Sequence, residues 1–278
     1  MPLGLHAEYF LSIGTMFQNE APYLKEWIEF HKIVGVEHFY LYSNFSTDNY
    51  QKVLQPYIEN GEVTLIEYPE RITTPEEFIS VQAYAFTHCC QNADSKWLAL
   101  IDTDEFLFPC QDHDLKDFLK KYESIPEIAV IYFCWYLYGT SYVDEIPKDR
   151  LLIEMLTKRC ESASPVGKTI LQPAKIDEII NAHIPKVKLG YLAVYTDLFP
   201  VITWNDHHIA TQFARINHYW SRDRKYFHAV KSKRDTISFH AQNREWVKSF
   251  DEEPYNKVED FAILRFTPEL KRRMNLSR

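Results

Sequence analysis

Strand-like and helix-like segments alternate through the first seventy residues of this 278-residue chain. Apolar runs of strand length cover Tyr9–Phe17, Val36–Tyr42 and Val63–Tyr68, and apolar residues at helical spacing cover about 22–34 and 50–58. Because short connections join these segments, the order β-α-β-α-β predicts parallel strands wound in a right-handed sense. The sequence therefore predicts an α/β fold with a mostly parallel central sheet flanked by helices.

An acidic triplet follows the next strand. A helical pattern over Glu76–Gln91 leads to the buried-type strand Trp97–Ile101, which runs straight into Asp102-Thr103-Asp104. Ligands of open α/β sheets bind beyond the carboxyl ends of the strands. Two carboxylates placed there repel each other, and a hard divalent cation with oxygen ligands removes that repulsion. The triplet therefore predicts a metal site, although Asp-x-Asp also occurs in ordinary surface loops.

Composition excludes several classes of partner and location. The net charge of −8 argues against a nucleic-acid surface. Five cysteines without C-x-x-C spacing favour reduced thiols and a cytoplasmic location. No stretch approaches the ~20 apolar residues of a membrane helix, which leaves peripheral membrane association open, and the N-terminus does not read as a signal peptide.

A series of motifs over about Phe10 to Lys233 resembles glycosyltransferase family 92 and its bacterial and viral relatives in the family-2-like clan. The matching early pieces are Phe17-Gln18-Asn19-Glu20, Tyr23-Leu24-Lys25-Glu26-Trp27, His31, Gly35-Val36, Tyr42-Ser43-Asn44, Ser46 and Asp48. The later pieces are Gln82, Cys90, the strand and triplet from Trp97 to Phe106, Trp135, Tyr138-Gly139-Thr140, Lys168, His183 and Ile216-Asn217-His218-Tyr219. Each fragment is weak evidence alone, and their common order is specific.

The resemblance implies a GT-A (Rossmann-like) fold and an inverting transfer of a sugar from a nucleotide-sugar, usually a UDP-sugar, to a glycan or other hydroxyl acceptor. It implies Mn²⁺ or Mg²⁺ as the cofactor at a metal site of Asp102, Asp104 and His218, with Asp104 as direct ligand, Asp102 on the ribose or a metal-bound water, and His218 as the remaining protein ligand. The same resemblance places the nucleoside against two loops, at Asn19 and Glu20 and at Asn44 and Asp48. We expect one domain over residues 1–240, with a nucleotide-binding half at about 8–110 and an acceptor half at about 111–240. Residues 241–278 are expected to form a helical C-terminal extension.

Several of these residues also have simpler structural explanations. Asn19-Glu20 could cap the helix that follows, Asn44 and Asp48 are common turn residues, and His218 could be a satisfied core histidine. Lys168 is interpreted as a diphosphate contact or, equally, as a solvated loop lysine. Trp135 is expected in the core.

The general base is the least constrained assignment. An inverting transfer needs a carboxylate within hydrogen-bond reach of the acceptor hydroxyl. The candidates after the triplet are Asp144, Glu145, Glu178, Asp197 and Asp206. We choose Asp206 because it lies in the polar, aromatic cluster Trp204–His208.

One departure from the family pattern and two alternative functions are also considered. Family members often follow the late His-Tyr with a basic residue and Ser, whereas this chain has Arg222-Asp223. The alternatives are a metal-dependent nucleotidyltransferase, although the acidic Gln18-Asn19-Glu20 replaces the expected basic glycine-rich loop, and a non-catalytic carbohydrate-binding protein on the same fold.

Overall fold

The computed structural model describes residues 7–71, 75–202, 207–233 and 251–276. The α-helices are α1 (Ala21–Ile33), α2 (Tyr50–Glu59), α3 (Pro75–Asn92), α4 (Leu115–Lys120), α5 (Leu152–Met155), α6 (Arg224–Ala229) and α8 (Thr267–Met274). The short 3₁₀ helices are η1 (Pro173–Lys175), η2 (Lys231–Lys233), η5 (Glu253–Tyr255) and η6 (Ala262–Phe266). The strands are β1 (Tyr9–Phe17), β2 (His38–Ser43), β3 (Val63–Glu67), β4 (Ser95–Leu100), β5 (Glu105–Pro109), β6 (Ile128–Leu137), β7 (Lys158–Arg159), β8 (Ser164–Leu171), β9 (Ile176–Asn181), β10 (Ile184–Val187), β11 (Leu192–Tyr195), β12 (Ala214–His218) and β13 (Val258–Glu259).

A 9-stranded sheet in the order β3-β2-β1-β4-β8-β6-β12-β5, with β11 beside β6, forms the centre of the molecule. Strands β1 to β4 are mutually parallel, as the sequence predicted. In the second part of the sheet, β8 lies antiparallel between β4 and β6, and β5 lies antiparallel to β12. These two strands run against the other seven, so the α/β class and the mostly parallel sheet are confirmed.

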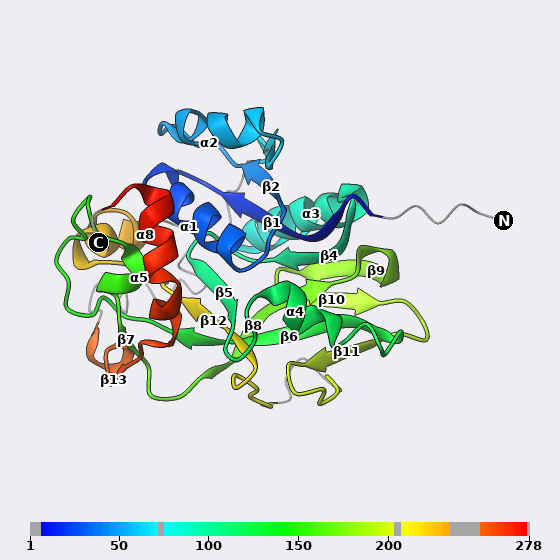
Figure 1. The fold of residues 1–278 in the computed structure, drawn as a ribbon. Helices are drawn as coiled ribbons and strands as arrows, with labels where there is room; N and C mark the ends of the chain where they lie inside the picture. The colour runs from blue at the N-terminus through cyan, green and yellow to red at the C-terminus, as the bar shows by residue number, and fades with distance from the viewer. Residues whose placement is uncertain (1–6, 72–74, 203–206, 234–250, 277–278) are drawn as a thin grey trace.

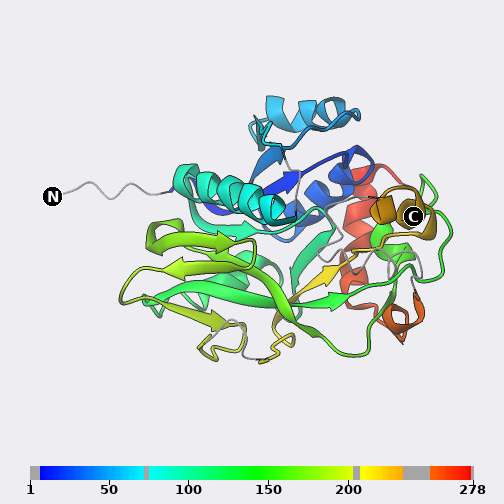
Figure 2. The same cartoon turned by 180° about the vertical axis from the view of Figure 1, so that it is seen from behind.

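Helices cover both faces of the sheet. α1 and α8 pack together on one face, and α3 lies on the other, where Figure 2 shows it in front. The strand β4 serves both faces: Trp97 and Ala99 join the core under α1, and Leu98 and Leu100 join the core under α3. A strand buried on both sides must be apolar throughout, which explains the unbroken apolar run before the triplet.

Two glycines, Gly14 and Gly35, lie where the backbone requires a residue without a side chain. Gly35 follows α1 with a φ of 99°, the left-handed conformation that commonly ends a helix. At Gly14 in β1, an added Cβ would lie 2.5 Å from the Cys89 Sγ atom of α3, so the helix packs directly on the strand backbone. Both positions bring helices close enough to cover β1.

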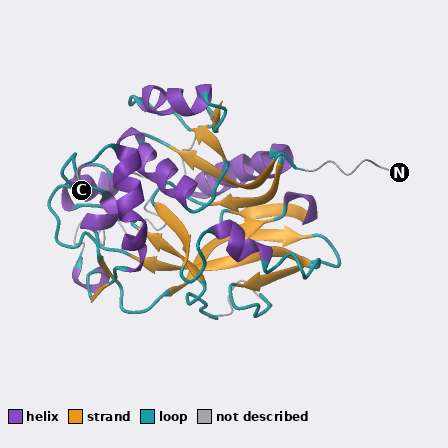
Figure 3. Ribbon diagram, viewed as in Figure 1, coloured by secondary structure: helices purple, strands orange, loops and turns teal. Residues whose placement is uncertain are grey.

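The described C-terminal residues wrap back onto the domain, beside α1 in Figure 3. The spacing at Phe261 to Phe266 was expected to be helical, and it forms the 3₁₀ helix η6, which continues into α8. The rest of that expectation, at Trp246, Val247 and Phe250, falls outside the described residues. The described cysteines are all free thiols, and no described helix is long and apolar enough to cross a bilayer.

Candidate active site

The acidic triplet forms the turn between β4 and β5, at the carboxyl end of β4. Glu105 closes this turn through two hydrogen bonds to Asp102. Its backbone N–H donates to the Asp102 carbonyl over 3.1 Å, and its Oε2 accepts the Asp102 backbone N–H over 2.8 Å. Glu105, the residue after the triplet, therefore fixes the turn. The side chains of Asp102 and Asp104 contact different partners.

Asp104 is held in a nearly buried cationic setting. Its Oδ1 atom lies 3.3 Å from Nε2 of His218, at the end of β12, and its Oδ2 atom lies 2.8 Å from Nζ of Lys231 in η2. The three side chains are each only 13–14% exposed. Burial alone would raise the pKa of Asp104, but Lys231 and His218 hold it well below its usual range. The carboxylate is therefore ionised and positioned to bind cations.

Asp102 faces a different set of partners. Its Oδ1 atom accepts a hydrogen bond of 2.8 Å from Nε2 of Gln82 in α3, and its Oδ2 atom lies 2.9 Å from Nζ of Lys168 in β8. Lys168 is only 1% exposed, so it is not a solvated loop lysine. Burial opposes its charge, yet Asp102 and Glu105 raise its pKa. Lys168 thus acts in this structure as the buried counter-ion of Asp102.

Glu105 is a buried acid whose role the sequence did not reveal. It is 0% exposed, and burial raises its pKa well above its usual range, with Asp102 and Asp104 adding to the effect. Its position directly before the apolar run Phe106–Phe108, in the strand β5, was the available signal. Lys231 had no local signal at all, because its contact with Asp104 spans 127 residues.

Asn19 and Asp48 form hydrogen bonds that join the loop after β1 to the loop after β2. Oδ1 of Asn19 accepts the Thr47 backbone N–H over 2.7 Å, and Asn19 itself has a φ of 56°. Oδ2 of Asp48 accepts the backbone N–H of Ala21 over 2.8 Å, at the start of α1. The helix is thus capped by Asp48 from the neighbouring loop, whereas Glu20 makes no side-chain cap. The interpretation of Glu20 as a cap is therefore wrong.

Asn44 and Glu20 are both buried. Nδ2 of Asn44 donates to the carbonyl oxygens of Tyr68 (2.9 Å) and Glu70 (2.8 Å), which fixes the end of β3 against β2. Glu20 forms an ion pair with Arg222. The structure brings the four predicted nucleoside-binding residues to the carboxyl edge of β1 and β2, with their polar atoms engaged between loops.

Trp135 lies between two histidines next to the triplet. Its ring centroid is 5.3 Å from that of His183 and 4.6 Å from that of His218, and the side chain is only partly buried. Burial, together with Lys168, lowers the pKa of His183 to about 4, so its ring is neutral. Trp135 packs against the main core as expected and also borders the site.

The candidate general bases are scattered. Asp144 and Glu145 form ion pairs with Arg224 (3.0 Å) and Lys225 (2.7 Å), and Asp197 pairs with His208 at 2.8 Å. Asp206, which the sequence favoured, lies outside the described residues.

The residues around Asp104 fit a divalent cation. Asp104 and His218 present facing ligand atoms, and the ammonium of Lys231 on the second Asp104 oxygen shows that a positive group is accommodated there. Asp102 does not complete a set of three ligands with them. Among the described residues, the side chains close enough to share one ion as a group of three are His113, Asp114 and Asp117, at the start of α4, where His113 and Asp117 are exposed and Asp114 is half-buried.

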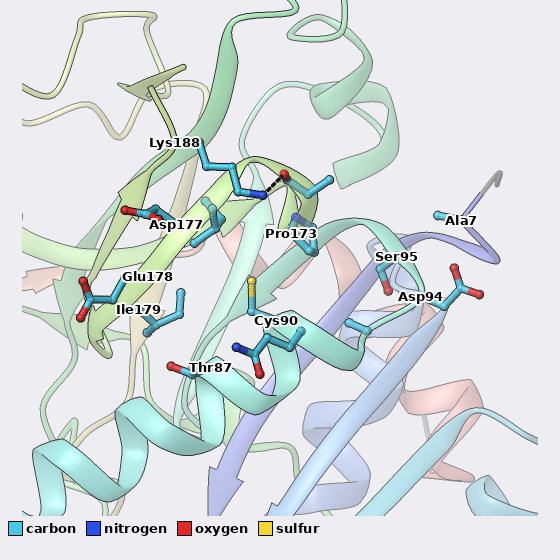
Figure 4. Close-up of a pocket in the computed structure, with 14 residues that line it drawn as sticks. Ala7, Thr87, Cys90, Asp94, Ser95, Pro173, Asp177, Glu178, Ile179 and Lys188 are labelled. Atoms are coloured by element: carbon cyan, nitrogen blue, oxygen red, sulfur yellow. Dashed lines mark hydrogen bonds between the residues drawn. The ribbon is translucent and has the colours of Figure 1, made fainter. Parts of the chain in front are cut away.

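A separate cavity of about 410 Å³ lies at the opposite end of β4 (Figure 4). Ser95 at the beginning of β4 lines it, together with Cys90 of α3 and Ile179 of β9. Lys188 also lines it and donates to the Ala174 carbonyl. Asp102 lies seven positions after Ser95 along an extended chain, a span of about 23 Å. The cavity is therefore distinct from the acidic site.

The fold and this site define a class of α/β protein with an acidic, cation-accepting loop at the carboxyl edge of its sheet. The family model described as glycosyltransferase family 92 matches residues 7–274, and the chain belongs to that family. Curated relatives of the same family include proteins of Oryza sativa subsp. japonica, 28% identical over 63% of this chain, and of Arabidopsis thaliana, 29% identical over 59%. The chain spans about a third of the length of these relatives, 30% and 28% respectively.

Solved structures show a weaker likeness. TarS 1–349 of S. aureus in complex with UDP is 13% identical, with a TM-score of 0.38 over 59% of this chain and 47% of that one. Glucosyl-3-phosphoglycerate synthase from Mycobacterium tuberculosis, in complex with Mn²⁺, UDP and glucosyl-3-phosphoglycerate, is 14% identical, with a TM-score of 0.35 over 62% of this chain and 60% of that one. At these values the family assignment rests on the sequence match. The sheet order and the acidic turn after β4 agree with the GT-A fold that the family resemblance implied.

Proposed function

We propose that this protein transfers a sugar from a nucleotide-sugar donor, a UDP-sugar, to a hydroxyl group of a glycan or other acceptor, with inversion at the anomeric carbon. The observation that carries the proposal is the pairing of Asp104 with His218 at the carboxyl end of a central strand, in a chain of glycosyltransferase family 92.

Asp104 and His218 would hold a divalent cation, Mn²⁺ or Mg²⁺, and Asp102 would lie beside it. The imidazole ligand favours Mn²⁺ slightly. A bound cation would neutralise the negative charge that develops on the departing nucleoside diphosphate. Lys231 would add a second positive charge once it leaves the Asp104 oxygen that it now contacts.

Asn19, Glu20, Asn44 and Asp48 would form or support the wall against which the nucleoside binds. The carboxyl edge of β1 and β2, where they lie, is where ligands of such sheets approach. Lys168 would act indirectly, since it is buried behind Asp102 and has no surface to offer a phosphate. This replaces the direct diphosphate contact expected from sequence.

Inversion requires that the acceptor oxygen attack the anomeric carbon as the bond from that carbon to the diphosphate breaks. A carboxylate must take the acceptor proton, and we propose Asp206 for that role. Asp206→Asn is expected to reduce transfer to the acceptor by at least about a hundredfold, while leaving the affinity for UDP unchanged. Weakened UDP binding by this variant would argue against a base role.

The experiment that tests the proposal is a panel of nucleotide-sugars incubated with the protein and MnCl₂, monitored for released nucleoside diphosphate. Release that requires both the metal and an acceptor supports the transferase. Release of pyrophosphate would instead support a nucleotidyltransferase. Glycan binding in calorimetry, without nucleotide or metal binding, would support a non-catalytic carbohydrate-binding protein. The cytoplasmic location stays a prediction, to be checked by imaging the tagged protein in its own cells.

A further inference from the structure

Arg222 is a wholly buried arginine in the turn after β12, at the position where the sequence departs from the family pattern. Its side chain is 1% exposed and pairs with the carboxylate of Glu20. The guanidinium carbon lies 3.6 Å from the ring centroid of Tyr23 and 4.6 Å from that of Tyr226. Arg222 also has a φ of 52°, a left-handed conformation that is unfavourable for a non-glycine residue.

A continuous set of bonds connects this arginine to the acidic turn. The backbone N–H of Tyr219 donates to the Asp104 carbonyl over 2.8 Å, and the backbone N–H of Arg222 donates to the Tyr219 carbonyl over 3.1 Å. The turn that carries Arg222 is therefore hydrogen-bonded, through Tyr219, to Asp104, the residue that we propose as metal ligand.

On the other side, Glu20 connects to the first loop. Its backbone carbonyl accepts the N–H groups of Tyr23 and Leu24 (2.9 and 3.1 Å), which begin α1. The preceding residue, Asn19, holds the second loop through Thr47. The Arg222–Glu20 pair thus joins the two loops at β1 and β2 to the turn that bears Asp104 and His218.

We propose that Arg222 is a positioning residue that sets the spacing between the nucleoside-binding loops and the diphosphate-binding site. The inference rests on the proposed function and extends it. A buried ion pair is often no more stabilising than apolar side chains of the same volume. The planar guanidinium, packed against the two aromatic rings, instead defines one relative position of two loops that are otherwise separate. UDP must contact both at once, whereas uridine or pyrophosphate needs only one.

The test compares three ligands, each titrated with MnCl₂ present: UDP, uridine and pyrophosphate. For Arg222→Met we expect the dissociation constant of UDP to rise at least about tenfold, with less than about a twofold change for uridine and for pyrophosphate, because only UDP uses the spacing. Arg222→Lys keeps the charge but lacks the planar fork, so we expect an intermediate loss for UDP. The double variant Glu20→Gln/Arg222→Met removes both buried charges, and we expect it to regain stability without regaining UDP affinity.

A matched control is Arg215→Met, which also breaks a buried arginine–carboxylate pair, with Asp260 at 2.7 Å, away from the two loops. It should lower stability and leave the UDP affinity unchanged. If Arg222→Met does not fold, Arg222→Lys carries the comparison, because it keeps the buried charge beside Glu20. Equal weakening of all three ligands, or unchanged UDP binding, overturns the inference. If the wild-type protein binds no UDP with manganese, the proposed function itself fails.

Discussion

Residues 8–110 and residues 111–240 are built on different principles, although they share one sheet. In the first half, the pairings among β1, β2, β3 and β4 are all parallel, and the apolar residues of these strands lie in two core clusters. In the second half, β8 enters antiparallel between β4 and β6, and β9 and β10 form a separate hairpin. Charged pairs hold this half to the C-terminal residues. The sheet is thus regular where strands of one half pair with each other, and irregular where strands from distant parts of the sequence meet.

A nearly buried cluster of charges joins the second half to the C-terminal segment. Asp260, from the C-terminal segment, pairs with Arg159 of β7 (2.6 Å) and Arg215 of β12 (2.7 Å), and the ring of Tyr136 lies between the two guanidinium groups. The active site forms where the halves join, with Asp104 from one and His218 from the other. The candidate site therefore depends on the parallel strands of the first half and on the mixed strands of the second half.

Removal of the Asp104 carboxylate should give the largest effect, because both halves meet at it. We expect Asp104→Asn to lower the turnover of a UDP-sugar on the order of a thousandfold, since a cation site contributes several kcal/mol to the transition state. Released UDP measured across a manganese titration checks this. Asp117→Asn, which changes an exposed acid of α4, is the control. Unchanged turnover in the Asp104 variant would place the chemistry elsewhere.

Loss of Asp260 should destabilise the second half. Asp260→Ala leaves two buried guanidinium groups without their carboxylate, and such a change costs about 3–5 kcal/mol. We expect this loss in the free energy of unfolding measured with urea. Glu269→Ala breaks the exposed pairs with Arg272 and Arg273 on α8 and should change stability little. Similar losses in both variants would mean that burial of the pair is not what matters.

The sequence predicted the first half more completely than the second, where it predicted the strand β6 and little else. β1 matches its expected range Tyr9–Phe17, because a strand that begins and ends with its own apolar run needs no information from elsewhere. Strand β8 was not predicted: it contains Gly167 and Lys168, and its identity depends on pairing with β4 and β6. At the site, the triplet was visible as a motif. The family resemblance also singled out His218, Lys168 and Gln82. It did not show that Lys168 and Gln82 contact Asp102, and Lys231 had no signal, because these residues come from distant elements.

A contact between the two halves, made by Glu26, also predicts that stability depends on pH. The Glu26 carboxylate, in α1, accepts the backbone N–H groups of Leu152 (2.9 Å) and Ile153 (3.2 Å), which begin α5. Burial raises the pKa of Glu26 to about 7, despite these two bonds. Between pH 4.5 and 7 the folded state therefore holds a proton that the unfolded chain releases.

Because the folded state binds more protons in that window, stability due to Glu26 is fully present below pH 4.5 and falls as the pH rises to 7. The slope cannot exceed about 1.4 kcal/mol per pH unit. Free energies of unfolding at pH 5 and pH 7.5 measure it, and Glu26→Gln should lower the difference between the two. A larger difference in the variant would show that Glu26 is ionised when folded.

The smallest expected effect tests whether the first half is held together locally, as its sequence suggests. Asp48 caps α1 from another loop, 27 residues away, whereas Asp114 caps α4 from the residue directly before that helix. Each cap contributes about 1 kcal/mol, so Asp48→Ala and Asp114→Ala should lower stability by similar amounts. Only Asp48→Ala should also raise the dissociation constant of UDP, because that cap fixes the two loops proposed to bind the nucleoside. If both variants bind UDP as the wild type does, the contact between the loops is structural and the nucleoside is bound by other residues.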